Sequence, residues 1–153
     1  MKTLLLLSLV IFTFSFGYSQ VDCLQKAWID YEKNNWNEAI QQAKDCTIQF
    51  GPRARKTQKD LLAQNYTFPC DFNVPNDCTP AQKDEIFSHG LLNDVAASYW
   101  IIGMCSLRLE NNDAAKNAFE KAKELTFGLC YNPDTKNFWS PSEEAELQLD
   151  DMD

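Results

Sequence analysis

The chain has 153 residues and a formal charge of −8, from 22 acidic and 14 basic side chains. Such an acidic balance argues against nucleic acid and anionic membranes as partners, because both require clustered Lys and Arg. The length suits one domain with a modest core and is too short for two ordinary domains.

The N-terminus has the organisation of a secretory signal peptide. Lys2 supplies a short basic start, residues 4–16 are almost wholly apolar, and Gly17 and Ser19 are the small residues of a cleavage site. The apolar run of about thirteen residues is too short to span a bilayer as a helix, so no membrane insertion is expected after the signal is removed. Cleavage of residues 1–19 would leave 20–153 as a single helical domain and, with Lys2 lost, change the charge from −8 to −9.

The destination of the protein follows from the same segment. The Ser19-Gln20 junction resembles the cleavage sites of Bacteroidetes-type bacteria, which implies a secreted or periplasmic protein. A lipid anchor on Cys23 is the alternative, but the residues before Cys23 lack the small lead-in that lipoprotein signals carry.

Six cysteines in the mature chain indicate disulfide bonds formed in an oxidising compartment. Fifteen pairings are open, and the expected helices narrow them. One pair would meet across a tight helical turn, one flanks a short loop, and one would join the last hairpin to the segment after it. No CxxC pair occurs and His89 is the only histidine, so we expect neither a metal site nor a cofactor. The expected bridges are Cys23–Cys46, Cys70–Cys78 and Cys105–Cys130.

Two helices are predicted at the start of the mature chain. Apolar residues recur at helical spacing over residues 21–33 and again over residues 36–50, with a turn at Asn34-Asn35 between them. The second helix is expected to end at Gly51, because Gly commonly ends helices and Pro52 can open the next one. A third helix is expected over Pro52–Gln64, although its basic first turn opposes the helix dipole.

The chain changes character at residue 65. Residues 65–79 contain two prolines and little periodicity, and are expected to form a loop insertion pinned by two cysteines. Thr79, Pro80 and Gln82 form a capping box, which predicts a fourth helix that ends at Gly90.

Two further helices are predicted after the fourth. The fifth, capped by Asn93 or Asp94, is expected to reach about Leu109. After a turn at residues 111–112, the sixth is expected to end near residues 127–128.

Residues 97–125 alternate small and large apolar residues at helix-hairpin spacing, with Gly103 in the first helix and Phe119 in the second. This stretch resembles one tetratricopeptide (TPR) unit. Its residues overlay the first hairpin at an offset of 76: Gly103, Ala115, Phe119 and Ala122 match Ala27, Ala39, Ala43 and Cys46.

The offset is about twice the TPR period of about 34 residues, plus an insertion. The resemblance therefore implies an all-α fold of TPR-like antiparallel hairpins stacked as a short solenoid, with a divergent middle hairpin that carries residues 65–79. Cys46, in place of an alanine, and Ala43, in place of a larger residue, depart from the family pattern.

Function is expected on the face that the first helices of such hairpins line. Repeat scaffolds bind segments of other proteins and seldom catalyse reactions, and aromatic and Arg side chains dominate binding energy. The alternative for the tryptophans is burial in the core, since they lie among apolar neighbours. The predicted function is a non-catalytic adaptor for a protein or peptide partner, and the expected binding residues are Trp28, Tyr31, Glu32, Trp100, Met104 and Arg108.

Residues 127–153 are expected to form an aromatic-rich capping segment and an acidic tail. Aromatic side chains crowd residues 127–139, as is typical of a segment that covers the open end of a repeat array. Ser140 begins a second capping box, which predicts a short acidic helix. The alternative is an aromatic platform around Phe138-Trp139 that stacks on sugar rings, as in a carbohydrate- or cell-envelope-binding module.

Catalytic chemistry finds little support in the sequence. His89 has no evident partner, and no glycine-rich phosphate loop occurs. The paired acids Glu143-Glu144 and Asp150-Asp151 suit a helix start and a solvated tail. The protein is therefore not expected to be an enzyme.

Overall fold

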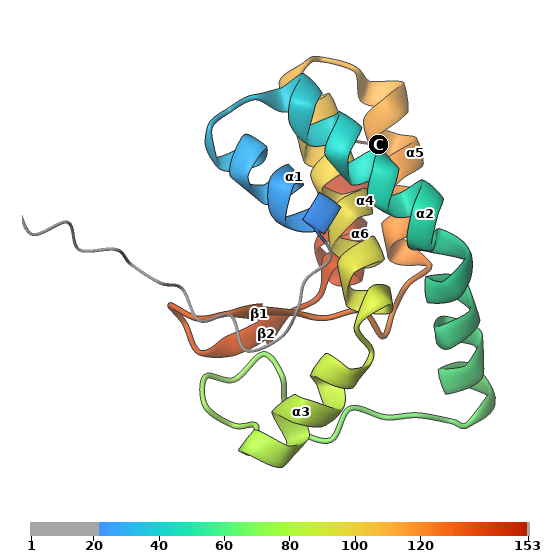
Figure 1. The fold of residues 1–153 in the computed structure, drawn as a ribbon, viewed down its shortest axis with the longest axis vertical. Helices are drawn as coiled ribbons and strands as arrows, with labels where there is room; N and C mark the ends of the chain where they lie inside the picture. The colour runs from blue at the N-terminus through green and yellow to red at the C-terminus, as the bar shows by residue number, and fades with distance from the viewer. Residues whose placement is uncertain (1–21, 153) are drawn as a thin grey trace, which may run out of the picture.

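The computed structural model describes residues 22–152 (Figure 1). The predicted signal peptide and the predicted mature start at Gln20 lie outside the described residues. Over the described range the chain is mainly helical, which confirms that part of the predicted fold class. It is not purely helical, because Cys130–Asn132 (β1) and Asn137–Trp139 (β2) form a two-stranded antiparallel sheet. Within residues 22–152 no helix is both long and apolar enough to cross a membrane.

The first hairpin consists of α1 (Asp22–Glu32) and the start of α2 (Trp36–Ala63). Asn34 takes a left-handed backbone conformation in the turn, with a φ of 61°, which Asn tolerates better than most residues. Small buried side chains let the two helices approach closely, and Cys23 bonds to Cys46 across them, as predicted.

Helix α2 continues through Gly51 and Pro52 to Ala63, so the predicted helix end at Gly51 and the separate helix over Pro52–Gln64 are wrong. Proline removes one backbone donor but fixes φ near the helical value, which a well-packed helix can accommodate. Packing holds the second half of α2 in place. Ala54 is fully buried, and Gln58 donates from Nε2 to Thr126 Oγ1 at 2.7 Å and accepts from the Phe127 backbone N–H at 3.1 Å.

The loop after α2 is pinned by the Cys70–Cys78 disulfide, as predicted. The predicted capping box also forms at the start of α3 (Pro80–Ser88). Thr79 Oγ1 accepts from the Gln82 backbone N–H at 3.3 Å, and Gln82 Oε1 accepts from the Thr79 backbone N–H at 2.8 Å. Gly90 then turns the chain with a φ of 38°.

Helix α4 (Leu91–Arg108) begins directly after Gly90, so Asn93 and Asp94 are not its caps. Both lie inside the first turn and are buried. Asn93 donates from Nδ2 to the Ile86 carbonyl and accepts from the Leu129 backbone N–H, each at 3.0 Å. One amide therefore joins α3, α4 and the start of the sheet.

Helices α5 (Asn112–Lys123) and α6 (Pro141–Met152) complete the helical part. Helix α5 ends at Lys123, earlier than the predicted end near residues 127–128. The capping expected at Ser140 is present, because its Oγ accepts from the Glu143 backbone N–H at 3.2 Å. Helix α6 packs along α5 and covers it through buried Ala145.

No middle hairpin separates the two outer ones in the described chain. Helix α4 packs directly against α2 and α1, and α3 lies apart from α2, below α4 in Figure 1. The expected divergent middle hairpin is therefore wrong. Residues 52–90 instead extend α2, form the disulfide loop and build the short helix α3.

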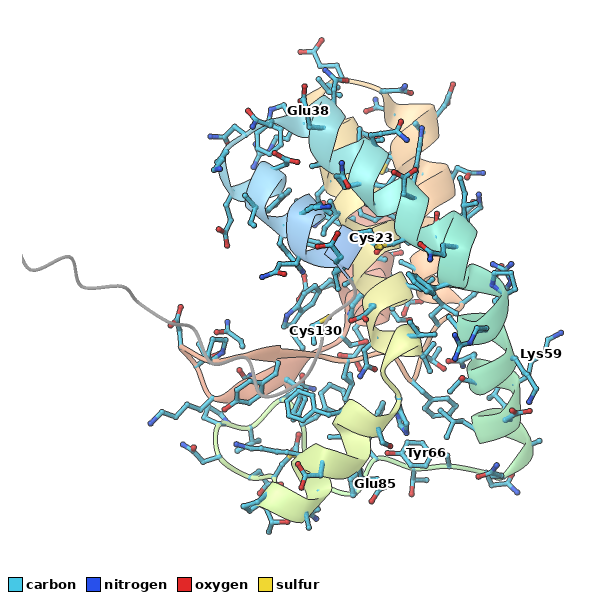
Figure 2. The ribbon with its side chains drawn as sticks, viewed as in Figure 1. Cys23, Glu38, Lys59, Tyr66, Glu85 and Cys130 are labelled. Atoms are coloured by element: carbon cyan, nitrogen blue, oxygen red, sulfur yellow. A yellow bond between two sulfur atoms is a disulfide. The ribbon has the colours of Figure 1, made fainter. Side chains whose placement is uncertain are left out.

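Cys105 and Cys130 are free thiols, so the expected bridge between them is wrong. Cys130 on β1 (Figure 2) lies close enough to Asp94, near the start of α4, for that carboxylate to raise the pKa of its thiol, which burial raises more strongly. Cys105 lies eleven residues further along α4 and is fully buried in the core, whereas Cys130 is only partly buried at the start of β1. Burial raises the pKa of the Cys105 thiol to about 12.

The predicted pairing of Gly103 with Phe119 is a close contact between α4 and α5. A Cβ atom at Gly103 would lie 2.3 Å from Phe119 Cε1, whereas one at Gly51 would meet only the flexible end of Arg55 at 3.3 Å. We therefore expect Gly103→Ala to lower the free energy of unfolding by about 1–3 kcal/mol. The control, Gly51→Ala within α2, should be neutral or stabilising by up to about 1 kcal/mol. Urea denaturation measures both, and equal effects would contradict the packing described.

Candidate functional site

All four tryptophans of the chain gather with Tyr31 into one group of rings. We call this group the five-ring cluster. Its members come from α1, the start of α2, α4 and β2. In Figure 1, α1 and α4 lie beside α2, and β2 lies below α1. Each member is half-buried, with one side packed on the core between α1, α2 and α4 or on a neighbouring ring. The cluster consists of Trp28, Tyr31, Trp36, Trp100 and Trp139.

Trp100 is the hub of the five-ring cluster. Its ring centroid lies 5.2 Å from Trp139, 5.7 Å from Tyr31 and 5.9 Å from Trp28. Trp36 joins through Tyr31 at 5.7 Å, and Trp28 also meets Trp139 at 6.3 Å. All these separations fall in the range of favourable aromatic pairs, so the rings stabilise one another while part of each remains accessible.

The rings meet at steep angles. The interplanar angle is smallest for Trp28 with Trp100, at 37°, and largest for Trp28 with Tyr31, at 86°. Edges therefore cover faces, and the rings do not form a coplanar platform. The surface is irregular and apolar, which suits the side chains of a polypeptide better than the flat side of a sugar ring.

One polar group in the five-ring cluster has no partner among the described residues. The Trp100 Nε1–H group is buried without a hydrogen-bond acceptor. A buried unpaired donor costs about 1–3 kcal/mol, so this N–H group lowers the stability of the cluster in the structure described.

The other three predicted binding residues, Arg108, Met104 and Glu32, are not members of this cluster and differ from one another in their environment. Arg108 is exposed, and its charge partly offsets the burial that raises the pKa of Tyr31. Met104 instead packs toward α5 and α6, half-buried beside the Phe119 group. Glu32 is exposed at the end of α1, and we find no hydrogen bond or ion pair for its side chain among the described residues.

Trp36 and Trp139 belong to the site but were not predicted in it. Trp36 has the spacing of a core residue of the second helix, and Trp139 lies in a segment assigned to a separate site. Successive side chains of a strand point to opposite faces, and this alternation is the signal that would have placed Trp139 and Phe138 in different surroundings. Phe138 points the other way and is fully buried, with its ring centroid 5.1 Å from Tyr131 and 5.3 Å from Phe87.

His89 lies in a second aromatic group, next to Tyr66, with ring centroids 5.0 Å apart. Burial lowers the pKa of His89, opposed by a hydrogen bond to the Phe127 backbone and by the charge of Glu85. Burial and the neighbouring Glu85 raise the pKa of Tyr66 to about 12. Both groups therefore stay neutral near pH 7 and serve the packing of α3. Among the described residues, no group of three or more His, Cys, Asp or Glu side chains is placed to hold a metal ion.

Comparison with known proteins adds no relative to this picture. No family model, no curated protein and no solved structure matches the chain. The function must therefore be inferred from the geometry of the protein itself.

The contact between Trp100 and Trp139 should be measurable as a coupling energy. Trp100→Leu and Trp139→Leu, singly and together, should give a coupling of about 0.5–1.5 kcal/mol in the free energy of unfolding. The matched control is the cycle of Trp36→Leu with Trp139→Leu, two rings of the same cluster that do not touch, which should couple by less than about 0.5 kcal/mol. A Trp100–Trp139 coupling no larger than the control would contradict the cluster.

Proposed function

We propose that this protein is an exported, non-catalytic binding module that docks a protein or peptide partner through the five-ring cluster. The observation that carries the proposal is the convergence of all four tryptophans, from three helices and one strand, on one half-open surface. A monomer with no partner gains more stability by burying such rings fully.

The energetics of interfaces support a protein partner. Trp, Tyr and Arg are the residues most enriched among those that cost about 2 kcal/mol or more when truncated at an interface. The five-ring cluster offers four Trp and one Tyr, and exposed Arg108 acts electrostatically on Tyr31.

We further infer that the two hairpins form a short TPR-like array. The α1–α2 and α4–α5 hairpins pack directly, and Gly103 receives Phe119 as the resemblance implies. The five-ring cluster draws Trp28 and Tyr31 from α1 and Trp100 from α4, the first helix of each hairpin. In repeat proteins of this shape, that is the face on which partners bind.

Two disulfides are typical of proteins in an oxidising compartment. Together with the expected signal peptide, they support a periplasmic or extracellular location. We therefore propose that the partner is itself exported or displayed on the cell envelope.

The carbohydrate-binding alternative has less support. It needs Phe138 and Trp139 together on the surface, and Phe138 is fully buried. Trp139 is half-buried, with its ring covered in part by Trp28 and Trp100.

Affinity capture from the exported fraction of the native cell tests the proposal. The mature protein should retain a protein partner that the variant Trp28→Leu/Trp139→Leu loses by about tenfold or more, because two hot-spot rings are removed. The matched control, Phe68→Leu/Phe127→Leu, removes two half-buried rings of the other aromatic group and should retain the partner.

Circular dichroism of all three proteins checks that helicity is unchanged. Equal retention by both variants would overturn the proposal. A shift of tryptophan fluorescence with soluble glycans, without any protein captured, would favour the carbohydrate alternative instead.

A further inference from the structure

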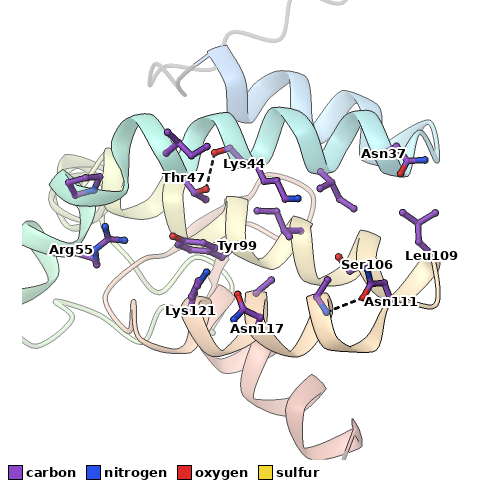
Figure 3. Close-up of a pocket in the computed structure, with 16 residues that line it drawn as sticks. Asn37, Lys44, Thr47, Arg55, Tyr99, Ser106, Leu109, Asn111, Asn117 and Lys121 are labelled. Atoms are coloured by element: carbon purple, nitrogen blue, oxygen red, sulfur yellow. Dashed lines mark hydrogen bonds between the residues drawn. The ribbon is translucent and has the colours of Figure 1, made fainter.

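A second surface lies between α2, α4 and α5. Figure 3 shows α2 and α5 as the two walls of a groove of about 650 Å³, with α4 behind them as its floor. That volume is within the usual range of ligand sites, about 300–1,000 Å³. On α4, Ile102 and Ser106 face the groove, and Trp100 lies on roughly the opposite helical face. The groove is therefore separate from the five-ring cluster.

The groove is cationic although the protein is acidic. Lys44 and Arg55 reach into it from α2 and Lys121 from α5 (Figure 3), and no Asp or Glu is among the residues that line it. The chain as a whole has a formal charge of −8, so a groove lined by three basic side chains and no acid is positive where the protein overall is negative.

These three cations lack ion-pair partners among the described residues, whereas other lysines have them. Lys26 pairs with Asp22 and Lys56 with Asp60, each at 2.6 Å, and Lys123 pairs with Glu146 at 2.8 Å. Lys44, Arg55 and Lys121 form no such pair, and Lys121 instead lies 5.9 Å from the centre of the Tyr99 ring. Three like charges along one groove leave a positive potential that an anionic ligand would neutralise.

The spacing of the charges indicates an elongated ligand. Lys44 and Arg55 are eleven residues apart along α2, about 16 Å measured along the path of the helix. A single carboxylate or phosphate cannot reach both. An extended peptide covers the same length with about five residues at about 3.3 Å each.

The apolar lining favours a peptide over an acidic sugar polymer. Ile102 and Ala118 are buried beneath the groove, and two exposed large apolar side chains are among its lining, Ile48 at 76% and Leu109 at 40%. Apolar side chains of a peptide would cover them. Asn37 and Asn117 of the lining supply both donors and acceptors for a peptide backbone, and Asn111, whose Oδ1 caps α5, supplies donors.

We propose that the α2–α4–α5 groove binds an acidic segment of a partner protein, in which carboxylates alternate with apolar side chains. The carboxylates pair with Lys44, Arg55 and Lys121, and the apolar side chains cover Ile48 and Leu109. This inference does not depend on the function proposed for the five-ring cluster.

Fluorescence anisotropy with a labelled ten-residue peptide of repeating Glu-Glu-Leu tests the groove. The mature protein should bind this peptide, and raising the salt from about 0.05 to about 0.3 M should weaken binding, because exposed ion pairs are screened. A peptide with Gln in place of Glu should bind at least about tenfold more weakly.

The decisive variant is Lys44→Gln/Arg55→Gln/Lys121→Gln, all exposed side chains whose loss should leave the fold intact. It should weaken the Kd for the Glu peptide by about tenfold or more. The matched control, Lys33→Gln/Arg53→Gln/Lys59→Gln, removes the same charge from exposed sites outside the groove and should stay within about twofold. Lys59 points away from the molecule on the outer side of α2 (Figure 2).

Three results would overturn the proposal: no binding of the Glu peptide, equal binding by the groove and control variants, or equal binding of the Gln peptide. Binding of polygalacturonate in the groove, lost in the groove variant while the peptide fails to bind, would assign the site to an acidic polysaccharide instead. Trp28→Leu/Trp139→Leu should bind the Glu peptide like the unmodified protein, so failure of one site is distinguishable from failure of the other.

Discussion

Burial of α4 is the constraint on which both surfaces of the protein depend. This helix packs against α1, α2, α5 and α6, and most of its residues are buried. One side of α4 carries Trp100 into the five-ring cluster, and the other supplies the floor of the cationic groove. Because α4 is held from several sides, the positions of both surfaces are fixed relative to each other.

Two small contacts make that burial feasible. Gly103 lets Phe119 approach the α4 backbone, which brings α5 close enough to form a wall of the groove. Near the start of α4, the buried Asn93 side chain hydrogen-bonds to the Ile86 carbonyl and to the Leu129 N–H. Because the donor and the acceptor of the buried Asn93 amide are both hydrogen-bonded, they fix the position of the sheet relative to α4. The sheet in turn places Trp139 against Trp100.

Local signals made much of the helical fold predictable. The capping box at Thr79, the hydroxyl cap at Ser140, the turn after α1 and the Cys23–Cys46 bridge depend on residues near in sequence or related by one helical hairpin. The errors came where packing outweighs local preference. Pro52 remains inside α2 because Ala54 and Gln58 are held by distant residues, and no local pattern records that support.

The candidate site was half predictable for the same reason. Trp28, Tyr31 and Trp100 lie on helical faces that the hairpin pattern brings together. Trp139 enters through a strand of three residues, too short for its alternation to be recognised in the sequence. The positive charge of the groove was not predictable because Lys121 is far in the chain from Lys44 and Arg55, and only the packing of α5 against α2 and α4 brings the three together.

The two surfaces divide the molecule into an apolar and a cationic face, with acidic side chains over much of the rest. A partner that presents apolar side chains and a partner that presents carboxylates would be received on different sides of α4. Such an arrangement suits a module that holds two segments at once, and it needs no reactive group.

Fluorine NMR of the mature protein labelled with 5-fluorotryptophan tests the central claim most directly. The label gives one resonance for each of Trp28, Trp36, Trp100 and Trp139, read before and after addition of the protein retained from the exported fraction. The five-ring cluster predicts that all four resonances shift together at the same partner concentration. Binding of the partner with all four resonances unchanged would contradict it.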